Sequence, residues 1–417
     1  MSSESNIETA LVRTREAARS FAQCPTERKN AVLTALAGML RGGREEILAA
    51  NREDLASAAE AGVAGAMLER LALDDRRIDA MARSVEEVAA LRDPVGEVMA
   101  KWRRPNGLEI TQIRVPIGVI AIIYESRPNV TIDAAVLGLK AGNAVVLRGG
   151  REALRTNAAL AALAASALES SGVARDVLLF IANPDREIVQ TLKRSVDLID
   201  LIIPRGGKPL KDALAGSAVP ILPHFDGICH TYVDRGADLR MAEEICFNAK
   251  CSRPSVCNAM ETLLIHREAA PRLLPALAAR LEAAGVELRG CERTRALAPS
   301  AKAAIDADWD TEYLDLVLAI KIVDSIDEAI AFIARHGSGL ADAIVTSDEE
   351  MAQRFQHQVD SATVYVNAST RFTDGFEFGF GAETGISTNR LHARGPMGLR
   401  ELTTYKYVIR GSGQVRV

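Results

Sequence analysis

At 417 residues, the chain is long enough to form two or three domains with ample hydrophobic core. Its 25% charged and 48% hydrophobic residues are ordinary for a globular enzyme. The net charge of −5 argues against a nucleic-acid-binding protein, because such a protein needs a basic face. No run reaches the ~18 apolar residues of a transmembrane helix, and residues 1–8 do not have the form of a signal peptide, so we expect a cytoplasmic protein.

Residues 7–92 are rich in Ala, Leu, Glu and Arg with apolar spacing near 3.6, which predicts about four helices, one per ~20 residues, as a scaffold layer. Residues 108–115 alternate as a half-buried strand does, and residues 119–124 form a continuous apolar run typical of a buried parallel strand. Further strands are expected at 144–147, 177–181, 198–203 and 219–222. Helices at 130–140, 156–171, 185–194 and 207–215 separate them. This alternation predicts a parallel α/β sheet.

A second α/β unit is expected from about 234 to 360. Its predicted strands are 263–266, 286–288, 317–323 and 341–346, and its predicted helices are 238–249, 268–284, 325–335 and 348–357. Residues 373–400 are Gly-rich, and a loop of this length without regular structure tends to be functional. Residues 402–410 alternate again and predict a strand that pairs with another element or another subunit.

Two polar turns follow predicted strands of the first sheet, Arg148-Gly149-Gly150 and Arg205-Gly206-Gly207. Glycines let a backbone approach a ligand closely, and ligands of open α/β sheets bind beyond the carboxyl ends of strands. These turns therefore indicate either a nucleotide site or ordinary turn chemistry. Neither a GxGxxG fingerprint nor a GxxxxGK[ST] loop occurs in the sequence.

Cys257 is the candidate nucleophile of the chain. It ends a polar loop between a predicted helix and a predicted strand, with Lys250 and Arg253 nearby in sequence. Nearby positive charge favours the thiolate, which is the reactive form of cysteine. The alternative is a buried structural cysteine, because cysteine is among the most buried residue types.

The other cysteines give no metal or disulfide pattern. There are six in all, at positions 24, 229, 246, 251, 257 and 291, without a CxxC pair. Such a set predicts reduced thiols. The spacing of Cys246, Cys251 and Cys257 does not pair with a second Cys or His pair, so we predict no metal site.

Seven motifs, taken in order, resemble one known family. They are VPIGVI at 115–120, YESRPNVT at 124–131, KAGNAVVLRGG at 140–150, IPRGG at 203–207, CNAMET at 257–262, VNASTRF at 366–372 and HARGPMGL at 392–399. On these motifs the chain resembles the aldehyde dehydrogenase superfamily over essentially its whole length. The resemblance implies an α/β fold with two parallel α/β domains, one for the cofactor and one for catalysis, plus a projecting β element for oligomerisation.

The domain boundaries expected from this resemblance are as follows. Residues 1–107 and 117–233, with a returning segment at 360–375, would form the cofactor-binding domain. Residues 234–359 would form the catalytic domain, and residues 108–116 and 376–417 would form the oligomerisation and C-terminal element. The projecting strands have edges that a second subunit would cover, so a homodimer or homotetramer is expected.

The motifs are most similar to the branch of the superfamily that reduces an acyl phosphate. This similarity implies NADPH-dependent reduction of L-glutamyl 5-phosphate to L-glutamate 5-semialdehyde and phosphate, the second step of proline biosynthesis. It implies NADP as the cofactor and raises glutamate 5-kinase as a partner that would hand over the substrate. Cys257 would attack the acyl carbon and form a thioester, which then accepts hydride.

The resemblance also assigns roles to other residues. The oxyanion would be held by the backbone N–H of Cys257, or by a side chain of the turn at residues 126–129, either Ser126 or Asn129. Arg148 would hold the 2′-phosphate of NADP beside Gly149, Gly150, Arg205, Gly206 and Gly207. Glu312 would orient the nicotinamide ribose, with a solvated surface carboxylate as the alternative.

Substrate recognition needs cationic and anionic partners at once, because the substrate carries a carboxylate, an ammonium and a phosphate. The cations near the matched motifs are Arg253, Arg371, His392 and Arg394, with solvated surface charges as the alternative. Glu125 or Asp374 would meet the ammonium.

Two departures from the family pattern matter. His224 stands where hydrolytic relatives carry a Glu base, which favours transfer to phosphate over transfer to water. Leu340-Ala341 replaces an expected His-containing pattern. The alternatives left open are a non-phosphorylating aldehyde dehydrogenase and a non-catalytic relative that acts as a binding protein.

Overall fold

The computed structural model describes residues 3–63, 65–125, 127–222 and 226–416. The chain divides into two compact units. The first unit comprises Met1–His224, Gly379–Gly385 and Met397–Val417, and the second comprises Phe225–Phe378 and Ile386–Pro396. No helix in the described ranges is both long and apolar enough to cross a membrane.

The first unit begins with five helices in the described residues, where the sequence predicted about four. They are α1 (Ser3–Phe21), α2 (Thr26–Gly42), α3 (Arg44–Glu60), α4 (Ala66–Leu71) and α5 (Asp75–Ala90). Helix α5 shows why these residues fold in this way. Asp74 caps its amino end by accepting a hydrogen bond from Arg77 N at 2.7 Å, and Ile78, Met81 and Val85 bury one face.

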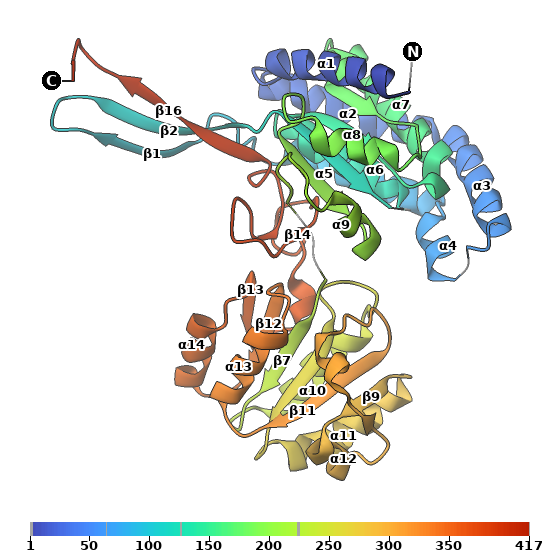
Figure 1. Cartoon of the computed structure of the whole chain (residues 1–417), viewed down its shortest axis with the longest axis vertical. Coiled ribbons are helices and arrows are strands. Elements are labelled where there is room, and N and C mark those ends of the chain that lie inside the picture. The colour runs from blue at the N-terminus through green and yellow to red at the C-terminus, as the bar shows by residue number, and fades with distance from the viewer. Residues whose placement is uncertain (1–2, 64, 126, 223–225, 417) are drawn as a thin grey trace. The chain divides into compact units, whose positions relative to one another are not determined.

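The sheet of the first unit is parallel, with strand order β5-β4-β3-β6 (Figure 1). Its strands are β3 (Val119–Tyr124), β4 (Ala144–Arg148), β5 (Leu178–Phe180) and β6 (Leu201–Arg205). The intervening helices are α6 (Pro128–Lys140), η1 (Arg151–Ala153), α7 (Leu154–Ser170), η2 (Arg175–Val177), α8 (Glu187–Arg194) and α9 (Lys208–Leu214). Every residue of β3 is buried, as the unbroken apolar run predicted. Residues 219–222 contribute only an isolated bridge between Ile221 and Ile202.

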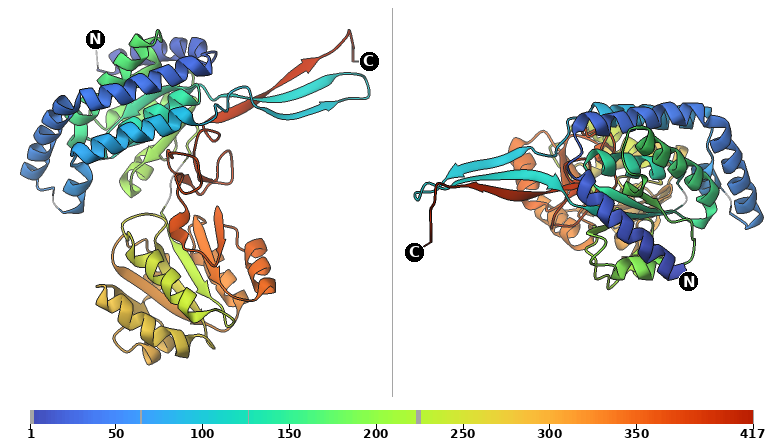
Figure 2. Two further views of the ribbon diagram at one scale, coloured as in Figure 1. Left: turned by 180° about the vertical axis from the view of Figure 1, so that it is seen from behind. Right: turned by 90° about the horizontal axis from the view of Figure 1, so that it is seen from above.

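A three-stranded antiparallel sheet projects from the first unit (Figures 1 and 2). Its strands are β1 (Val98–Arg103), β2 (Glu109–Pro116) and β16 (Thr403–Arg410). The predicted strands at 108–115 and 402–410 are confirmed, and they pair with each other within this chain. Strand β1 was not predicted, because its exposed residues show no clean alternation.

The second unit is built on a seven-stranded parallel sheet with strand order β10-β9-β11-β8-β7-β12-β13 (Figure 2). Its strands are β7 (Cys229–Val233), β8 (Met260–His266), β9 (Glu287–Gly290), β10 (Lys302–Ala303), β11 (Val317–Val323), β12 (Ala341–Val345) and β13 (Thr363–Val366). Its helices are α10 (Leu239–Cys251), α11 (Ala270–Ala283), α12 (Glu292–Leu297), η3 (Asp306–Asp310), α13 (Ile326–His336), α14 (Glu349–Gln358) and η4 (Thr370–Phe372).

Helices cover both faces of this sheet, so neighbouring residues of one strand enter different cores. Leu263 and Ile265 of β8 join the cluster formed with α10 and α11. Leu264, between them, joins the cluster formed with α13 and α14. A strand buried on both faces tends to be apolar. In β8 the apolar run is limited to residues 263–265, and in β11 it is interrupted by Lys321.

Three boundary predictions are wrong. Strand β13 pairs with β12, so the segment 360–375 belongs to the second unit and does not return to the first. Strand β7, which was not predicted, pairs with β8 and β12, so the second unit begins before residue 234. The segment 376–417 is shared between the units, and within it β14 (Ile386–Ser387) pairs with β15 (Gly395–Pro396).

Candidate active site

Cys257 lies at the amino-terminal edge of the second unit's sheet. Because the strands are parallel, the segments that precede them meet at one edge. The segments before β7, β8, β11 and β12 carry Gly227, Cys257, Glu312 and Ser338 respectively. This edge is opposite to the carboxyl-terminal edge where ligands of open α/β sheets usually bind.

The loop that carries Cys257 is held by close backbone packing. A Cβ atom on Gly227 would lie 1.9 Å from the carbonyl oxygen of Cys257, so only glycine fits there. The thiol of buried Cys229 donates to the same carbonyl oxygen at 3.3 Å. The next residue, Asn258, donates through Nδ2 to Thr373 O at 2.8 Å, and Thr370 Oγ1 donates to Asn258 O at 2.7 Å. The candidate nucleophile Cys257 therefore lies on a braced loop.

Two of the predicted substrate cations lie beside this loop. Arg371 Nε donates to Ser252 Oγ at 3.1 Å, and another guanidinium nitrogen donates to Asn258 Oδ1. Burial and the nearby charge of Arg253 lower the pKa of Arg371, while the charge of Cys257 acts in the opposite direction. The structure thus brings Arg253, Arg371 and Cys257 within electrostatic reach of one another. Positive charge beside a thiol favours its nucleophilic form.

Lys250 is not placed as the sequence suggested. Its ammonium is fully buried and lies 2.6 Å from the Glu261 carboxylate, which neutralises it. Arg371, and not Lys250, is therefore the candidate cation beside Cys257.

Glu312 belongs to the same edge as the nucleophile. Its Oε1 accepts a hydrogen bond from Gly227 N at 2.8 Å, and its side chain is partly buried. Burial raises its pKa, while the bond from Gly227 lowers it. Glu312 is therefore part of the braced site and is not a solvated surface carboxylate.

The other two predicted substrate cations have separate surroundings. Arg394 NH1 lies 2.7 Å from Asp360 Oδ1, and Arg390 bonds the same carboxylate. His392 is exposed, with a φ of 67°. The charge of Arg394 is thus already matched by a protein carboxylate.

The predicted cofactor turns lie at the carboxyl ends of strands in the first unit. Arg148 ends β4, and its NH2 donates to Pro184 O at 2.7 Å, while its buried Nε has no hydrogen-bond partner in the described residues. Burial lowers the pKa of Arg148, and the charges of Arg186 and Arg151 lower it further. Three cations therefore gather where the sequence predicted one. Arg151 was missed because it lies just beyond the motif that ends at Gly150, and Arg186 was missed because the β5–α8 connection carries no motif.

The two glycine turns have different neighbours. A Cβ on Gly149 would lie 2.3 Å from Nδ2 of Asn157, a buried nitrogen without a hydrogen-bond partner in the described residues. A Cβ on Gly206 would meet Glu125 at 2.7 Å, and Glu125 Oε1 accepts from Gly207 N at 3.3 Å. The Arg148 turn, with its cations and unpaired donors, suits an anionic nucleotide. The Glu125 carboxylate beside the Gly206 turn does not suit an anionic nucleotide, because like charges repel.

Of the remaining predicted residues, Asn129 lies at the start of α6, and Arg205 is near enough to affect the pKa of Asp133 on the same helix. Asn129 is exposed and donates through Nδ2 to Asp133 Oδ2 at 3.0 Å. Burial raises the pKa of Asp133 to about 6, while Asn129 and Arg205 lower it. Ser126 and His224 lie outside the described residues.

All six cysteines lie in the described ranges, and none of them forms a disulfide. No group of three or more His, Cys, Asp or Glu side chains in these ranges is arranged to hold a metal ion.

The sequence matches the profile of the Aldehyde dehydrogenase family over residues 1–304 and 308–408. It is 53% identical to the gamma-glutamyl phosphate reductase of Moorella thermoacetica over 98% of each chain. It is 55% identical to that of Carboxydothermus hydrogenoformans over 96% of this chain and 97% of the relative. The crystal structure of gamma-glutamyl phosphate reductase from Thermotoga maritima superposes with a TM-score of 0.96 at 47% identity, covering 98% of this chain and 99% of that one.

More distant relatives share the fold. Glyceraldehyde-3-phosphate dehydrogenase from Methanocaldococcus jannaschii superposes with a TM-score of 0.71 at 16% identity, covering 99% of this chain and 95% of that one. The predicted fold class is confirmed, and the chain belongs to the aldehyde dehydrogenase family.

Proposed function

We propose that the protein is an oxidoreductase that uses NADPH to reduce L-glutamyl 5-phosphate to L-glutamate 5-semialdehyde and phosphate, in proline biosynthesis. The observation that carries this proposal is the braced Cys257 loop with Arg371 and Arg253 beside it. Relatives about half identical over nearly the full chain, named for reduction of the same acyl phosphate, support the substrate.

Cys257 acts as the nucleophile in this proposal. Its thiolate attacks the acyl carbon, the acyl–phosphate bond breaks, and phosphate leaves with the bonding pair. The thioester then accepts hydride at the same carbon, and collapse of the thiohemiacetal returns the thiolate and releases the aldehyde. Arg253 and Arg371 bind an anionic group of the substrate, because a guanidinium matches phosphate and carboxylate geometry. The backbone N–H of Cys257 and a side chain of the turn at Ser126 and Asn129 stabilise the oxyanion.

The cofactor is assigned to the Arg148 turn of the first unit. When bound, NADPH supplies the hydride. Arg148, Arg151 and Arg186 hold the 2′-phosphate, and Gly149 and Gly150 let the backbone approach the nucleotide. Glu312 is assigned to the nicotinamide ribose, as the family resemblance implies.

Replacing Arg148 with Ala is expected to raise the Kd for NADPH by about 10- to 100-fold, because a charge-assisted hydrogen bond to the phosphate is lost. The Kd for NADH is expected to change much less, since NADH has no 2′-phosphate. Quenching of intrinsic fluorescence on titration measures both constants. Arg175→Ala, on the same unit but at an exposed ion pair with Glu169, is the matched control. Equal weakening of both cofactors would contradict the assignment.

One assay tests the function as a whole. NADP⁺ reduction is followed with glutamate semialdehyde, in the presence and absence of phosphate. We expect turnover only with phosphate, because the acyl group is transferred to phosphate in the reverse direction. Turnover without phosphate would identify a non-phosphorylating aldehyde dehydrogenase. No turnover under either condition would favour a binding protein.

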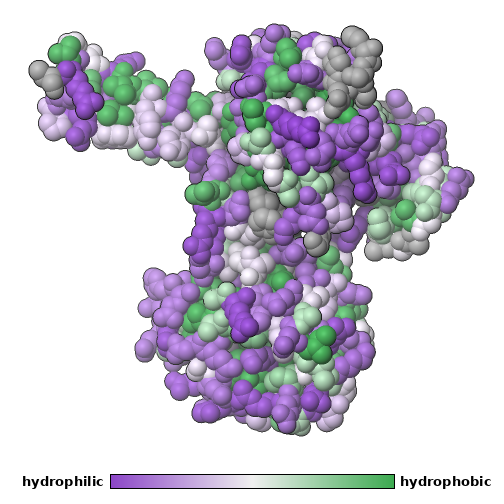
Figure 3. All heavy atoms as spheres, in the orientation of Figure 1, coloured by the Kyte–Doolittle hydropathy of each residue, from purple (hydrophilic) through white to green (hydrophobic). Residues whose placement is uncertain are grey.

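A homodimer or homotetramer is proposed, with the projecting sheet as the contact surface. One face of β16 exposes Tyr405, Tyr407 and Ile409, and Trp102 of β1 packs against Tyr407 with ring centroids 6.1 Å apart. Figure 3 shows hydrophobic residues along this sheet. Exposed apolar patches on open sheet edges mark interaction sites.

Light scattering during size-exclusion chromatography is expected to give at least twice the mass of 44.8 kDa at micromolar concentration. Tyr407→Glu is expected to shift the mass to that of a monomer, because it places a charge in the apolar contact. Lys406→Glu, on the opposite face of the strand, is the control. A wild-type monomer would contradict the proposal.

A further inference from the structure

The loop that carries Cys257 begins and ends at one buried ion pair. Lys250 lies in the last turn of α10, and Glu261 is the second residue of β8. Their side chains meet at 2.6 Å, and both are 0% exposed. The pair therefore joins the two ends of the eight-residue segment 252–259, which contains the nucleophile.

The same carboxylate also holds the loop of Glu312. Glu261 Oε1 accepts from Leu314 N at 3.3 Å, while Oε2 takes the bond from Lys250. Leu314 has a φ of 54°, a conformation that costs a non-glycine residue energy and needs such support. Two residues earlier, Glu312 accepts from Gly227 N, and Gly227 packs on the Cys257 carbonyl. The contacts thus close a ring through the Glu312 side chain and the backbone of Cys257.

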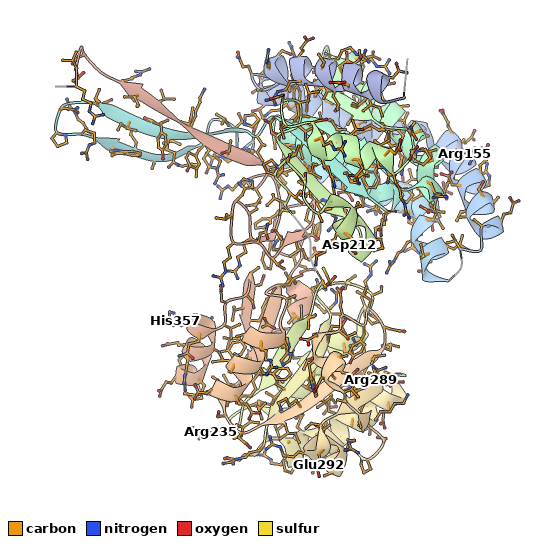
Figure 4. All side chains as sticks on the ribbon, viewed as in Figure 1. Arg155, Asp212, Arg235, Arg289, Glu292 and His357 are labelled. Atoms are coloured by element: carbon orange, nitrogen blue, oxygen red, sulfur yellow. The ribbon has the colours of Figure 1, made fainter. Side chains whose placement is uncertain are left out.

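Tyr313 lies close to two cations. Lys250 Nζ is 5.9 Å from the centre of its ring, and Cζ of Arg289 is 5.2 Å from it. Figure 4 labels Arg289 on the second unit. Burial raises the pKa of Glu261 to about 7, and the charge of Glu312 adds to this, while Lys250 and the Leu314 N–H lower it. Two buried charges are costly compared with an apolar pair of equal volume. The Lys250–Glu261 pair is therefore expected to have a role besides stability, at the base of the loop that carries Cys257.

We propose that Glu261 and Lys250 are positioning residues that set the placement of Cys257 and of the Glu312 loop for the reaction. This proposal rests on the proposed role of Cys257 as the nucleophile. Neither side chain touches the substrate. The ion pair fixes the ends of one loop, and the second carboxylate oxygen fixes the other loop relative to it.

Glu261→Gln tests this role in the full-length protein. The variant is expected to lower kcat by about 100-fold, because small displacements of reacting groups have effects of this size. The KM for NADP⁺ is expected to stay within about threefold of wild type, since the Arg148 turn is untouched. Alkylation of Cys257 by iodoacetamide, followed by mass spectrometry, is expected to slow by about tenfold as the thiol leaves the field of Arg371.

Asp93→Asn is the matched control. Asp93 pairs with buried Lys29 in the first unit, with side chains 7% and 1% exposed. This variant strands a buried lysine in the same way, so its thermal midpoint is expected to fall as in Glu261→Gln. Its kcat and its alkylation rate are expected to remain those of wild type.

The double variant Lys250→Met/Glu261→Met separates positioning from stability. Two apolar side chains of similar length leave no stranded charge, so the protein is expected to fold with a near wild-type thermal midpoint. Its kcat is still expected to be about 100-fold low, because both loops have lost their tie. Recovery of wild-type kcat and alkylation would overturn the proposal. If the wild-type enzyme shows no phosphate-dependent turnover, the proposed function is wrong. The alkylation rates of Cys257 in the variants then still test whether Lys250 and Glu261 set its placement.

Discussion

Replacing Cys257 with Ala is expected to lower kcat by at least ~10⁴-fold, the scale on which loss of a covalent nucleophile acts. The change deletes only one sulfur atom from a partly buried position, so folding is expected to be unaffected. NADPH binding is also expected to persist, because the substitution leaves every residue assigned to the cofactor unchanged. Hydride transfer is measured from the absorbance of NADPH, and binding is measured by fluorescence titration.

Two other cysteines serve as controls. Cys251 is partly buried at the end of α10, and Cys251→Ala is expected to keep most of the activity. Cys246 is fully buried in the core of the second unit, and burial raises its pKa to about 12. Cys246→Ala is therefore expected to lower the free energy of unfolding by ~1–2 kcal/mol and leave the chemistry intact. Wild-type turnover in Cys257→Ala together with its loss in Cys251→Ala would place the nucleophile elsewhere.

Most of the regular structure follows from local patterns in the sequence. The predicted strand at 317–323 matches β11 residue for residue, because its apolar residues are interrupted only by Lys321 and most of them are buried. Strand β7 was missed because Cys229, His230 and Thr231 break the apolar run. Inside the fold, His230 Nδ1 lies 2.9 Å from Asp342 Oδ1, within hydrogen-bond distance. A polar residue that is satisfied only by a distant partner is not recognisable from local sequence.

The residues of the candidate site also divide into those that local sequence indicates and those that only the fold brings together. The glycine turn at Arg148 and the nucleophile at Cys257 lie in motifs, so the sequence indicates them. Arg186 lies near Arg148 because β4 and β5 are neighbours in the sheet, while Arg151 follows the glycine turn directly. The sequence suggested Lys250 and Arg253 as the cations near Cys257, since both are close to it along the chain. The pairing of Lys250 with Glu261 follows from the strand that comes after the loop.

Gly227→Ala is expected to lower kcat by about 100-fold, because it displaces the nucleophile loop. The added Cβ would lie 1.9 Å from the carbonyl oxygen of Cys257, 2.5 Å from its carbonyl carbon and 2.6 Å from its Cα. These are backbone atoms, so no side-chain rotation relieves the clash. The loop must move by more than an ångström relative to Glu312, which is held by Gly227 N. Overpacking of this kind is expected to cost ~1–3 kcal/mol of folding free energy.

Gly236→Ala is the matched control for this change. It lies in the same unit, and an added Cβ would meet only Asp234 Oδ2 at 3.8 Å and Thr346 Oγ1 at 4.0 Å, both ordinary contact distances. Its kcat is expected to equal that of wild type. Steady-state kinetics and thermal unfolding on the same preparations separate displacement of the loop from loss of stability. If Gly227→Ala kept wild-type kcat, the nucleophile would not depend on the placement of the Cys257 backbone, and the braced loop would have no part in catalysis.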